Sequence, residues 1–370
     1  MRVSVERPFV LLTNARSRPL LKAIRHKLWS AVQNVERPAE SGVHIDPAEV
    51  PPVDMSTRSR WHREAVASPE MAAFHEVLRV DGRSVRESVL DDLATFYETT
   101  PEEARRRCLH WEQISVQEWA EAGGDEGDRG RVEFYRTTRS WSYDLMWWAY
   151  LQSEGHADPS NVVAVRFLQE WAPGRRHLDF GSGVGVTTQL FAALGWDSTM
   201  ADLSSTLLDF ARFRIERRGG HPTAIDLLDQ TLPAGGYDAI TAIDTLAHVP
   251  DINETARTLH AALGPDGVLV TNLDIREAAP ETVWHLHDDA KRAEYDLRRA
   301  GFVPLATMGY DMTGYRKVPA SGPRFRLFVF TSWLLLVSPP RRWAAAATRP
   351  LLRGLYRLRE RLRGGRRQDG

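Results

Sequence analysis

Short apolar runs alternate with helix-like stripes through the middle of the chain, between residues 158 and 308. Residues 176–180 have the pattern of a strand, and apolar residues at helical spacing follow from Thr187. A second strand pattern covers 197–200 and leads into another helical stripe. Strands that alternate with helices predict a parallel sheet covered on both faces. We therefore expect an α/β domain over residues 158–338.

The pattern before this domain is helical. Residues 55–157 contain two helix starts: Ser68-Pro69, with proline at the first helical position, and Thr100 to Glu103, which has the form of a capping box. We expect an α-helical domain here that can act as a substrate lid. Residues 1–54 are basic and interrupted by prolines, and they predict an N-terminal segment that ends in a linker.

Two patterns follow the predicted sixth strand, 302–308. Residues 327–337 are an apolar run too short to span a bilayer, which needs roughly 20 residues. This run is either the seventh strand of the sheet or an interfacial membrane segment. Residues 339–370 carry leucines at helical spacing among arginines and predict a basic amphipathic helical tail. Such a helix can lie on anionic lipid, bind RNA, dock on an acidic partner or pack on the chain's own acidic body.

Charge separates this tail from the rest of the chain. The 370 residues have a net charge of −1, but residues 316–370 contain fourteen Lys or Arg against two acids, which is +12 and leaves −13 for the preceding part. An acidic main body offers no long track for phosphates and argues against a nucleic-acid partner. Cys108 is the only cysteine, and the start of the chain has no secretory signal pattern. We expect a cytoplasmic protein, with peripheral membrane contact through the tail as an alternative.

Candidate chemistry is concentrated in one stretch, from His177 to Thr188. Three glycines stand at alternate positions in it: Gly181, Gly183 and Gly185. Glycines between a strand and a helix let a ligand lie on the backbone N–H groups at the helix N-terminus. Asp179 comes just before the turn, where its carboxylate can fix the loop or meet a cationic group of the ligand. Asp202 ends the next strand, where a Rossmann-type site binds ribose hydroxyls. The stretch therefore predicts a nucleoside-binding crevice.

This stretch resembles the first motif of the class I S-adenosylmethionine-dependent methyltransferases, an acid followed by x-GxGxG. Segments 201–204, 226–228, 237–244 and 263–270 resemble later parts of the family in the same order. The resemblance implies a Rossmann-like fold with a mostly parallel seven-stranded sheet, and S-adenosyl-L-methionine as the cofactor. It places the cofactor contacts at Asp179, Gly181, Gly183, Gly185, Asp202, Leu203, Asp226, Leu227 and Asp244.

The resemblance also bears on the type of reaction. An enzyme of this family would transfer a methyl group to an O, N or C atom of an acceptor, here expected to be a small molecule. An NAD-dependent oxidoreductase is disfavoured, because Val186 replaces the third glycine of GxGxxG and the chain has no Tyr-x-x-x-Lys pair. A second hypothesis is a cofactor-binding fold without catalysis, which would dock on a membrane surface or a partner through the basic tail.

The acceptor side is less constrained by the pattern. Residues 134–150 are dense in aromatic side chains, which can either join the helical domain to the sheet or form a wall of the substrate site. Tyr135, Tyr143 and Trp147 are the candidate substrate contacts. His287 is the candidate base and His248 its rival, although His287 can simply be exposed and His248 can be a structural histidine that bonds a loop carbonyl. The pattern His285-Leu286-His287-Asp288 does not by itself predict a metal site, because no second ligand cluster accompanies it.

Overall fold

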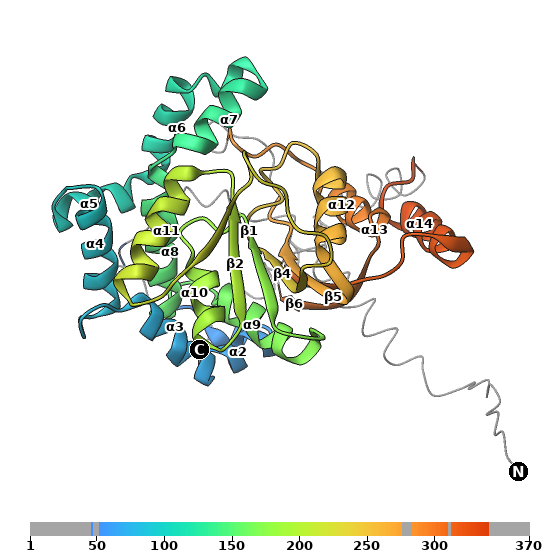
Figure 1. Cartoon of the computed structure of the whole chain (residues 1–370), viewed down its shortest axis with the longest axis horizontal. Helices are drawn as coiled ribbons and strands as arrows, with labels where there is room; N and C mark the ends of the chain where they lie inside the picture. The colour runs from blue at the N-terminus through green and yellow to red at the C-terminus, as the bar shows by residue number, and fades with distance from the viewer. Residues whose placement is uncertain (1–45, 47–51, 276–282, 310–311, 340–370) are drawn as a thin grey trace, which may run out of the picture. The chain divides into compact units, whose positions relative to one another are not determined.

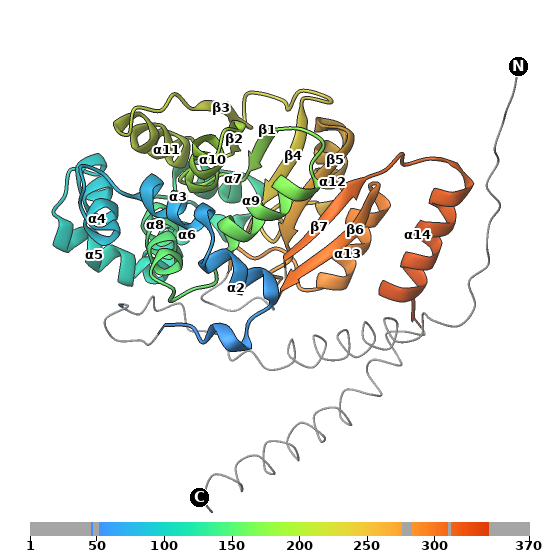
Figure 2. The same cartoon turned by 90° about the horizontal axis from the view of Figure 1, so that it is seen from below.

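The structure, a computed structural model, describes residues 46, 52–275, 283–309 and 312–339, which belong to one compact unit. Seven strands form one sheet of order β3-β2-β1-β4-β5-β7-β6 (Figure 1; all seven are labelled in Figure 2). The strands are β1 (Arg176–Phe180), β2 (Asp197–Asp202), β3 (Thr223–Asp226), β4 (Tyr237–Ala242), β5 (Leu263–Asn272), β6 (Phe302–Gly309) and β7 (Met312–Lys317).

The sheet is mostly parallel. Strands β1 to β5 pair in parallel, and β7 runs antiparallel to both β5 and β6. This confirms the expected α/β fold with a mostly parallel seven-stranded sheet. Because the carboxyl ends of parallel strands meet at one edge, β1 to β4 deliver the loops that follow them to the same side of the sheet.

Helices precede the sheet and connect its strands. Those before β1 are η2 (Met55–Thr57), α2 (Arg60–Val66), α3 (Pro69–Leu78), α4 (Val85–Phe96), α5 (Pro101–Leu109), α6 (Trp111–Glu121), η3 (Gly124–Glu126), α7 (Asp128–Thr137), α8 (Ser140–Ser153) and α9 (Ser160–Trp171). Those after β1 are α10 (Val186–Ala193), α11 (Ser205–Arg217), α12 (Ile252–Ala262), α13 (Ala290–Arg299) and α14 (Gly322–Leu336).

Alternate residues of the central strands enter two different cores. In β5, Val268 and Val270 pack into a core with α3, α4, α8, α9 and α10, whereas Leu269 packs into a core with α12 and α13. Ala239 and Ile240 of β4 divide in the same way. This is the period of two expected for a strand with both faces buried.

The helices before β1 share their core with the sheet. Phe74 of α3, Val89 of α4 and Trp147 of α8 lie in one buried cluster with Val186 and Phe191 of α10. Residues on both sides of the predicted boundary at 157/158 therefore belong to the same hydrophobic core. The predicted segments 1–54 and 339–370 lie outside the described residues, apart from Asp46, residues 52–54 and Pro339.

The expectation of a strand within 327–337 is wrong. That run lies in the helix α14, and the seventh strand is Met312–Lys317, inserted between β5 and β6. The sequence of β7, MTGYRK, contains a glycine and two cations and has only two large apolar residues, so its pattern is weak. The strand was predicted in the long apolar run 327–337 because apolarity alone does not distinguish a buried strand from a helix.

The predicted helix starts have different outcomes. The Ser68 side chain accepts the Met71 N–H, with Pro69 at the first helical position, as expected. Thr100 accepts the Glu103 N–H at 3.2 Å, but the Glu103 carboxylate turns to two arginines of α5 instead of completing a capping box.

One edge of the sheet is irregular. Strand β6 is an edge strand, carries Pro304 within its length, and shifts register against β7 between Pro304 and Ala306 and again between Thr307 and Gly309. The hydroxyl of Ser59, just before α2, donates to the Met308 carbonyl at 2.6 Å. The helical part therefore covers the end of this edge.

Candidate functional site

The turn after β1 is built so that only glycine fits it well. Gly181 has φ +69°, and a Cβ there would lie 2.3 Å from the Thr245 side chain. Gly185 has φ +71° at the N-cap of α10, where a Cβ would lie 3.0 Å from that of Ala211. A side chain at either position would combine backbone strain with a steric clash. The three glycines thus bring the backbone itself to the surface of the site.

Asp179 braces this turn from below. Its side chain is buried, and one carboxylate oxygen accepts the Thr188 N–H at 3.1 Å and the Thr188 hydroxyl at 2.9 Å. The other oxygen accepts the Thr241 hydroxyl at 2.8 Å. These bonds tie β1 and β4 to the first turn of α10. Burial, the largest effect, raises the pKa of Asp179 to about 6 despite these donors.

A buried histidine extends this chain of hydrogen bonds. His177 Nε2 lies 2.9 Å from the Thr241 hydroxyl, and Nδ1 lies 2.7 Å from the Ser198 hydroxyl. Because Thr241 donates to Asp179, it accepts from His177, so this network assigns the histidine proton to Nε2. Burial lowers the pKa of His177 to about 3, so the ring is neutral.

Asp202 connects the end of β2 to the glycine turn. One carboxylate oxygen accepts the Gly183 N–H and the other accepts the Ser204 N–H, both at 2.8 Å. Burial raises the pKa of Asp202 above its ordinary value, opposed by these backbone donors. Asp226, its neighbour in the register of β3, accepts the Leu228 N–H at 2.9 Å. The acids at the ends of β2 and β3 therefore stand side by side.

Asp244 completes the row of acids beyond β4. It has φ +52°, and its backbone N–H donates to the side-chain oxygen of Asn272 at 2.6 Å. The side-chain nitrogen of Asn272 donates in turn to the Asp244 carboxylate. These two contacts between the ends of β4 and β5 hold a non-glycine residue in the left-handed region.

A cavity of about 530 Å³, including its part open to solvent, lies over the glycine turn. Four of the nine predicted cofactor residues line it: Asp179, Gly181, Gly183 and Asp244. The other five, Gly185, Asp202, Leu203, Asp226 and Leu227, belong to the same turn or to the neighbouring strand ends. The nine predicted residues therefore lie at the cavity or at strand ends beside it.

Helix α8 forms a wall of the cavity. The helix contributes Leu145, Trp148, Ala149 and Gln152. A hydrogen-bond chain fixes this wall to α10, since Asn161 donates to Gln152 at 3.2 Å and accepts from Thr187 at 3.1 Å.

The predicted substrate contacts on α8 point elsewhere. Tyr143 and Trp147 are buried in the core, and Tyr143 stacks on Tyr97 at 5.2 Å between ring centroids while Arg107 donates to its hydroxyl. The cavity-lining residues were missed, although their spacing of i, i+3, i+4 and i+7 marks one face of a helix. Helical phase within the aromatic stretch was the signal that could have found them.

Tyr135 and the two predicted bases gather around one loop. The Tyr135 hydroxyl donates to the Trp284 carbonyl at 3.0 Å, and His248 Nδ1 lies 3.1 Å from the same oxygen. His287 Nε2 lies 2.6 Å from the Val249 carbonyl. Burial raises the pKa of Tyr135, so its hydroxyl stays protonated. None of these three residues lines the cavity described above, and the described residues contain no group of three or more His, Cys, Asp or Glu that could hold a metal ion.

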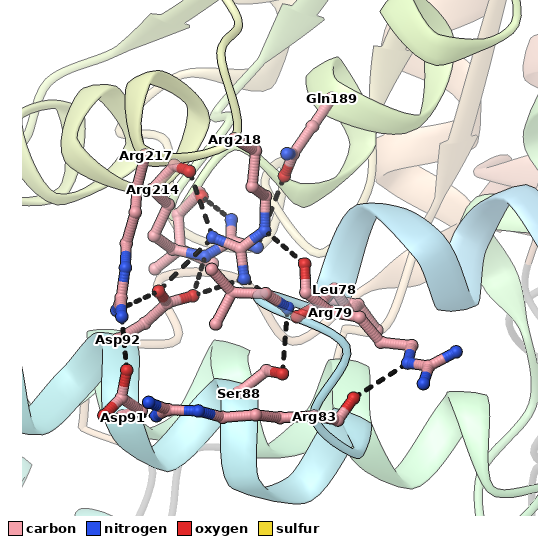
Figure 3. A network of polar contacts seen from close by, with 12 residues as sticks. Leu78, Arg79, Arg83, Ser88, Asp91, Asp92, Gln189, Arg214, Arg217 and Arg218 are labelled. Carbon is pink, nitrogen blue, oxygen red and sulfur yellow. Dashed lines mark hydrogen bonds and ion pairs between the residues drawn. The ribbon is translucent and has the colours of Figure 1, made fainter.

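A buried ionic network supports the glycine turn from the helical side (Figure 3). Arg214 of α11 is fully buried and donates to the Val184 carbonyl, inside the turn, at 2.8 Å. Asp92 of α4 is also fully buried and lies 3.5 Å from Arg214, 3.0 Å from Arg217 and 2.7 Å from Arg218. Burial lowers the pKa of Arg214 to about 10, which still leaves it cationic at neutral pH. One carboxylate of α4 thus anchors the side chain that holds the turn.

Comparison with known families assigns the part of the chain that carries this geometry. Residues 147–306 match a family described as a methyltransferase domain. This part of the chain is a methyltransferase domain. The match begins within α8 and ends within β6, so it includes the glycine turn, the row of acids and, of the α8 wall, Trp148, Ala149 and Gln152 but not Leu145. The resemblance to class I S-adenosylmethionine-dependent methyltransferases is confirmed for this domain.

Individual relatives match less than a third of this chain. The ubiquinone biosynthesis O-methyltransferase of Bordetella avium is 32% identical over 118 residues, which is 29% of this chain and 47% of that protein. The same enzyme of Actinobacillus pleuropneumoniae is 31% identical over 122 residues, 30% of this chain and 51% of that protein. The chain therefore spans about half the length of these relatives.

Solved structures give more distant likenesses. The 1,6-didemethyltoxoflavin-N1-methyltransferase of Burkholderia thailandensis is 21% identical and covers 44% of this chain and 77% of its own, with a TM-score of 0.34. Within the described part of the chain, no helix has the length and apolarity needed to cross a bilayer.

Proposed function

We propose that this chain is an S-adenosylmethionine-dependent methyltransferase that transfers a methyl group to an O, N or C atom of a small-molecule acceptor. The observation that carries the proposal is the glycine turn of the methyltransferase domain, braced by Asp179 and Asp202 beneath an open cavity. Bound S-adenosylmethionine supplies an electrophilic methyl group on a sulfonium. The contribution of the protein is then largely to bind, orient and exclude water.

The turn fits such a cofactor in two respects. Ser182 lines the cavity and its hydroxyl is buried without a hydrogen-bond partner, and an orphaned buried hydroxyl favours a ligand that pairs with it. A Cβ at Gly183 would lie 2.6 Å from Leu145 of the α8 wall, so glycine there keeps space open. We propose that the turn holds the methionine portion, Asp202 with Leu203 the ribose, and Asp226 with Leu227 the adenine.

Leu145 and Trp148 suit a role against the reacting group. Both line the cavity from α8, opposite the glycine turn, and both offer apolar surface there. Apolar walls displace water from the path between a methyl donor and its acceptor. We infer that this wall, rather than Tyr143 or Trp147, contacts the bound molecules.

A protonated acceptor would need a base, and His248 suits this role. The Trp284 carbonyl can only accept, so this contact assigns the proton of the neutral His248 ring to Nδ1. The same argument applied to His287 leaves Nδ1 as its basic nitrogen. Once an acceptor is known, His248→Gln should lower kcat with unchanged cofactor affinity; if only His287→Gln does so, the roles are reversed.

The test of the cofactor is calorimetry on the purified full chain. S-adenosylmethionine or S-adenosylhomocysteine should bind, and NAD should not. Asp202→Asn should weaken binding at least about tenfold, because a charge-assisted hydrogen bond is worth about 1.5–3 kcal/mol. Asp209→Asn is the matched control, since Asp209 forms an exposed ion pair with Arg212 on the neighbouring α11. Equal binding by both variants, or binding of NAD, would contradict the proposal.

We infer that the protein is cytoplasmic. This inference is supported by its single cysteine, which is buried and unpaired in the structure. The basic tail is proposed to dock on a membrane surface or on an acidic partner. If no acceptor and no cofactor were found to bind, this docking role would become the principal function.

A further inference from the structure

Helix α14 presents five large apolar side chains to solvent. Leu327, Phe330 and Leu335 are 62%, 55% and 64% exposed, and Trp333 and Leu334 are also exposed. The residues that this segment buries against the rest of the unit are Ser332, Leu336 and Ser338. A surface helix of a soluble protein has the opposite arrangement, with its apolar stripe turned to the core. We therefore expect the outer face of α14 to contact a partner or a surface outside the described unit.

The position of α14 leaves this face accessible. The helix packs on α13, and both views place it at the opposite end of the described unit from α4 and α5 (Figure 1, Figure 2). The other large exposed apolar residues among those described are Val66, Val116, Val132, Trp148 and Leu228, which lie singly on separate elements. The cluster on α14 is thus distinct from ordinary scattered exposure.

Charge identifies the kind of occupant. Arg324 and Arg326 at the start of α14 are exposed, and residues 340–370 contain ten arginines against two acids. We propose that the outer face of α14 binds the surface of an anionic bilayer, with its apolar side chains at the acyl boundary and Arg324 and Arg326 at the headgroups. Leu, Phe and Trp beside cationic residues form the composition of helices that lie in the plane of a membrane interface.

The length of the helix fits this orientation. Its 15 residues measure about 22 Å at 1.5 Å per residue, less than the roughly 30 Å of the hydrocarbon layer. The helix therefore lies on the bilayer and does not cross it. A second copy of the chain is the competing occupant. Among the described residues its only comparable apolar cluster is its own α14, so association would bring the arginines of two copies together.

Flotation of the full chain with lipid vesicles tests the proposal independently of any methyltransferase activity. The chain should float with vesicles that contain phosphatidylglycerol, and less with pure phosphatidylcholine. Leu327→Ser, Phe330→Ser and Leu335→Ser combined should lower partitioning into anionic vesicles at least about tenfold, because each substitution removes apolar groups that the bilayer would bury. The combination Val116→Ser and Val132→Ser, at exposed positions of α6 and α7, should float like the natural chain.

Two results would overturn the proposal. Equal flotation of the α14 variant and the natural chain would show that another segment, such as the basic tail, makes the contact. A natural chain that ignores vesicles but forms a dimer abolished by the α14 substitutions would assign the face to a second copy. Thermal unfolding of each variant provides the folding control, since the substituted side chains are exposed and should cost little stability.

Discussion

His177 and Asp179 are two buried groups of one hydrogen-bond chain whose pKa values move in opposite directions. The pKa of His177 falls to about 3 and that of Asp179 rises to about 6. Between pH 6 and pH 4 the folded chain therefore places a proton on Asp179, whereas the unfolded chain places one on His177. Their contributions to the pH dependence of stability oppose each other. In a variant that lacks one of these two groups, the pH dependence of stability should show the contribution of the other group alone.

Asp179→Asn tests this balance. A carboxyl with a raised pKa contributes stability at low pH that is lost as pH rises through 6. The variant lacks that contribution, so its free energy of unfolding relative to the natural chain should fall by about 3 kcal/mol between pH 7 and pH 4. Urea unfolding across this range measures it. His177→Gln should show a slope of the opposite sign, and parallel curves for all three proteins would contradict the prediction.

At the scale of elements, the contact of α4 with α11 depends on one carboxylate. Asp92 faces three arginines while fully buried, and Arg214, equally buried, continues the contact to the glycine turn (Figure 3). Two buried charges stabilise each other only as a pair, because removal of one leaves the other in a medium that solvates it poorly. The packing of these helices should therefore be sensitive to this single charge.

Asp92→Asn is expected to lower the free energy of unfolding by about 3–5 kcal/mol. Asp91→Asn is the matched control on the same helix, since Asp91 is partly exposed and pairs with Arg83 and Arg217, and it should cost about 1 kcal/mol or less. Denaturant unfolding of both proteins measures the difference. Similar losses in the two variants would mean that the buried network adds no stability of its own.

Some elements could be predicted from the sequence and others could not, for physical reasons. The strands β1 and β2 and the glycine turn carry local signals: apolar runs, three glycines and an acid at each strand end. Strand β7 carries none, because its place between β5 and β6 depends on pairing with distant strands. The apolar side chains of α14 face outward, so the usual inference from apolarity to core failed there.

The candidate site divides in the same way. Residues on the turn and at the strand ends follow from the motif, whereas the α8 wall required the phase of a helix whose aromatic residues point in several directions. Trp147 enters the core and its neighbour Trp148 reaches the cavity. Composition pointed to this helix, but only the packing of the helix shows which of the two tryptophans lines the cavity.

At the scale of the whole unit, the helices before β1 and the sheet share one core. Trp147 is fully buried in that core, on the helix that also lines the cavity. A lid that moves as a separate body would need an interface with the sheet that can open. The interface between these helices and the sheet is instead continuous with the core of the fold. We therefore expect the helical part and the sheet to unfold together.

Trp147→Ala should cost about 3–5 kcal/mol and should lower protection in both parts. Native-state hydrogen exchange is the measurement: amides of α4 and amides of β4 should lose protection by the same free energy. Trp148→Ala, at the half-exposed neighbouring position, should cost much less. If the α4 amides alone were affected, the helices would form an independently folding domain.

The irregular edge strand β6 has a consequence for the behaviour of the protein at high concentration. The edge of any open sheet offers a free row of backbone donors and acceptors, with which another polypeptide can pair as an added strand. Pro304 has no backbone N–H to donate, the two register shifts make the strand irregular, and the Ser59 hydroxyl donates to the Met308 carbonyl near its end. The opposite edge, β3, is only four residues long. The sheet is therefore poorly suited to seed fibrils, even when many copies are crowded together.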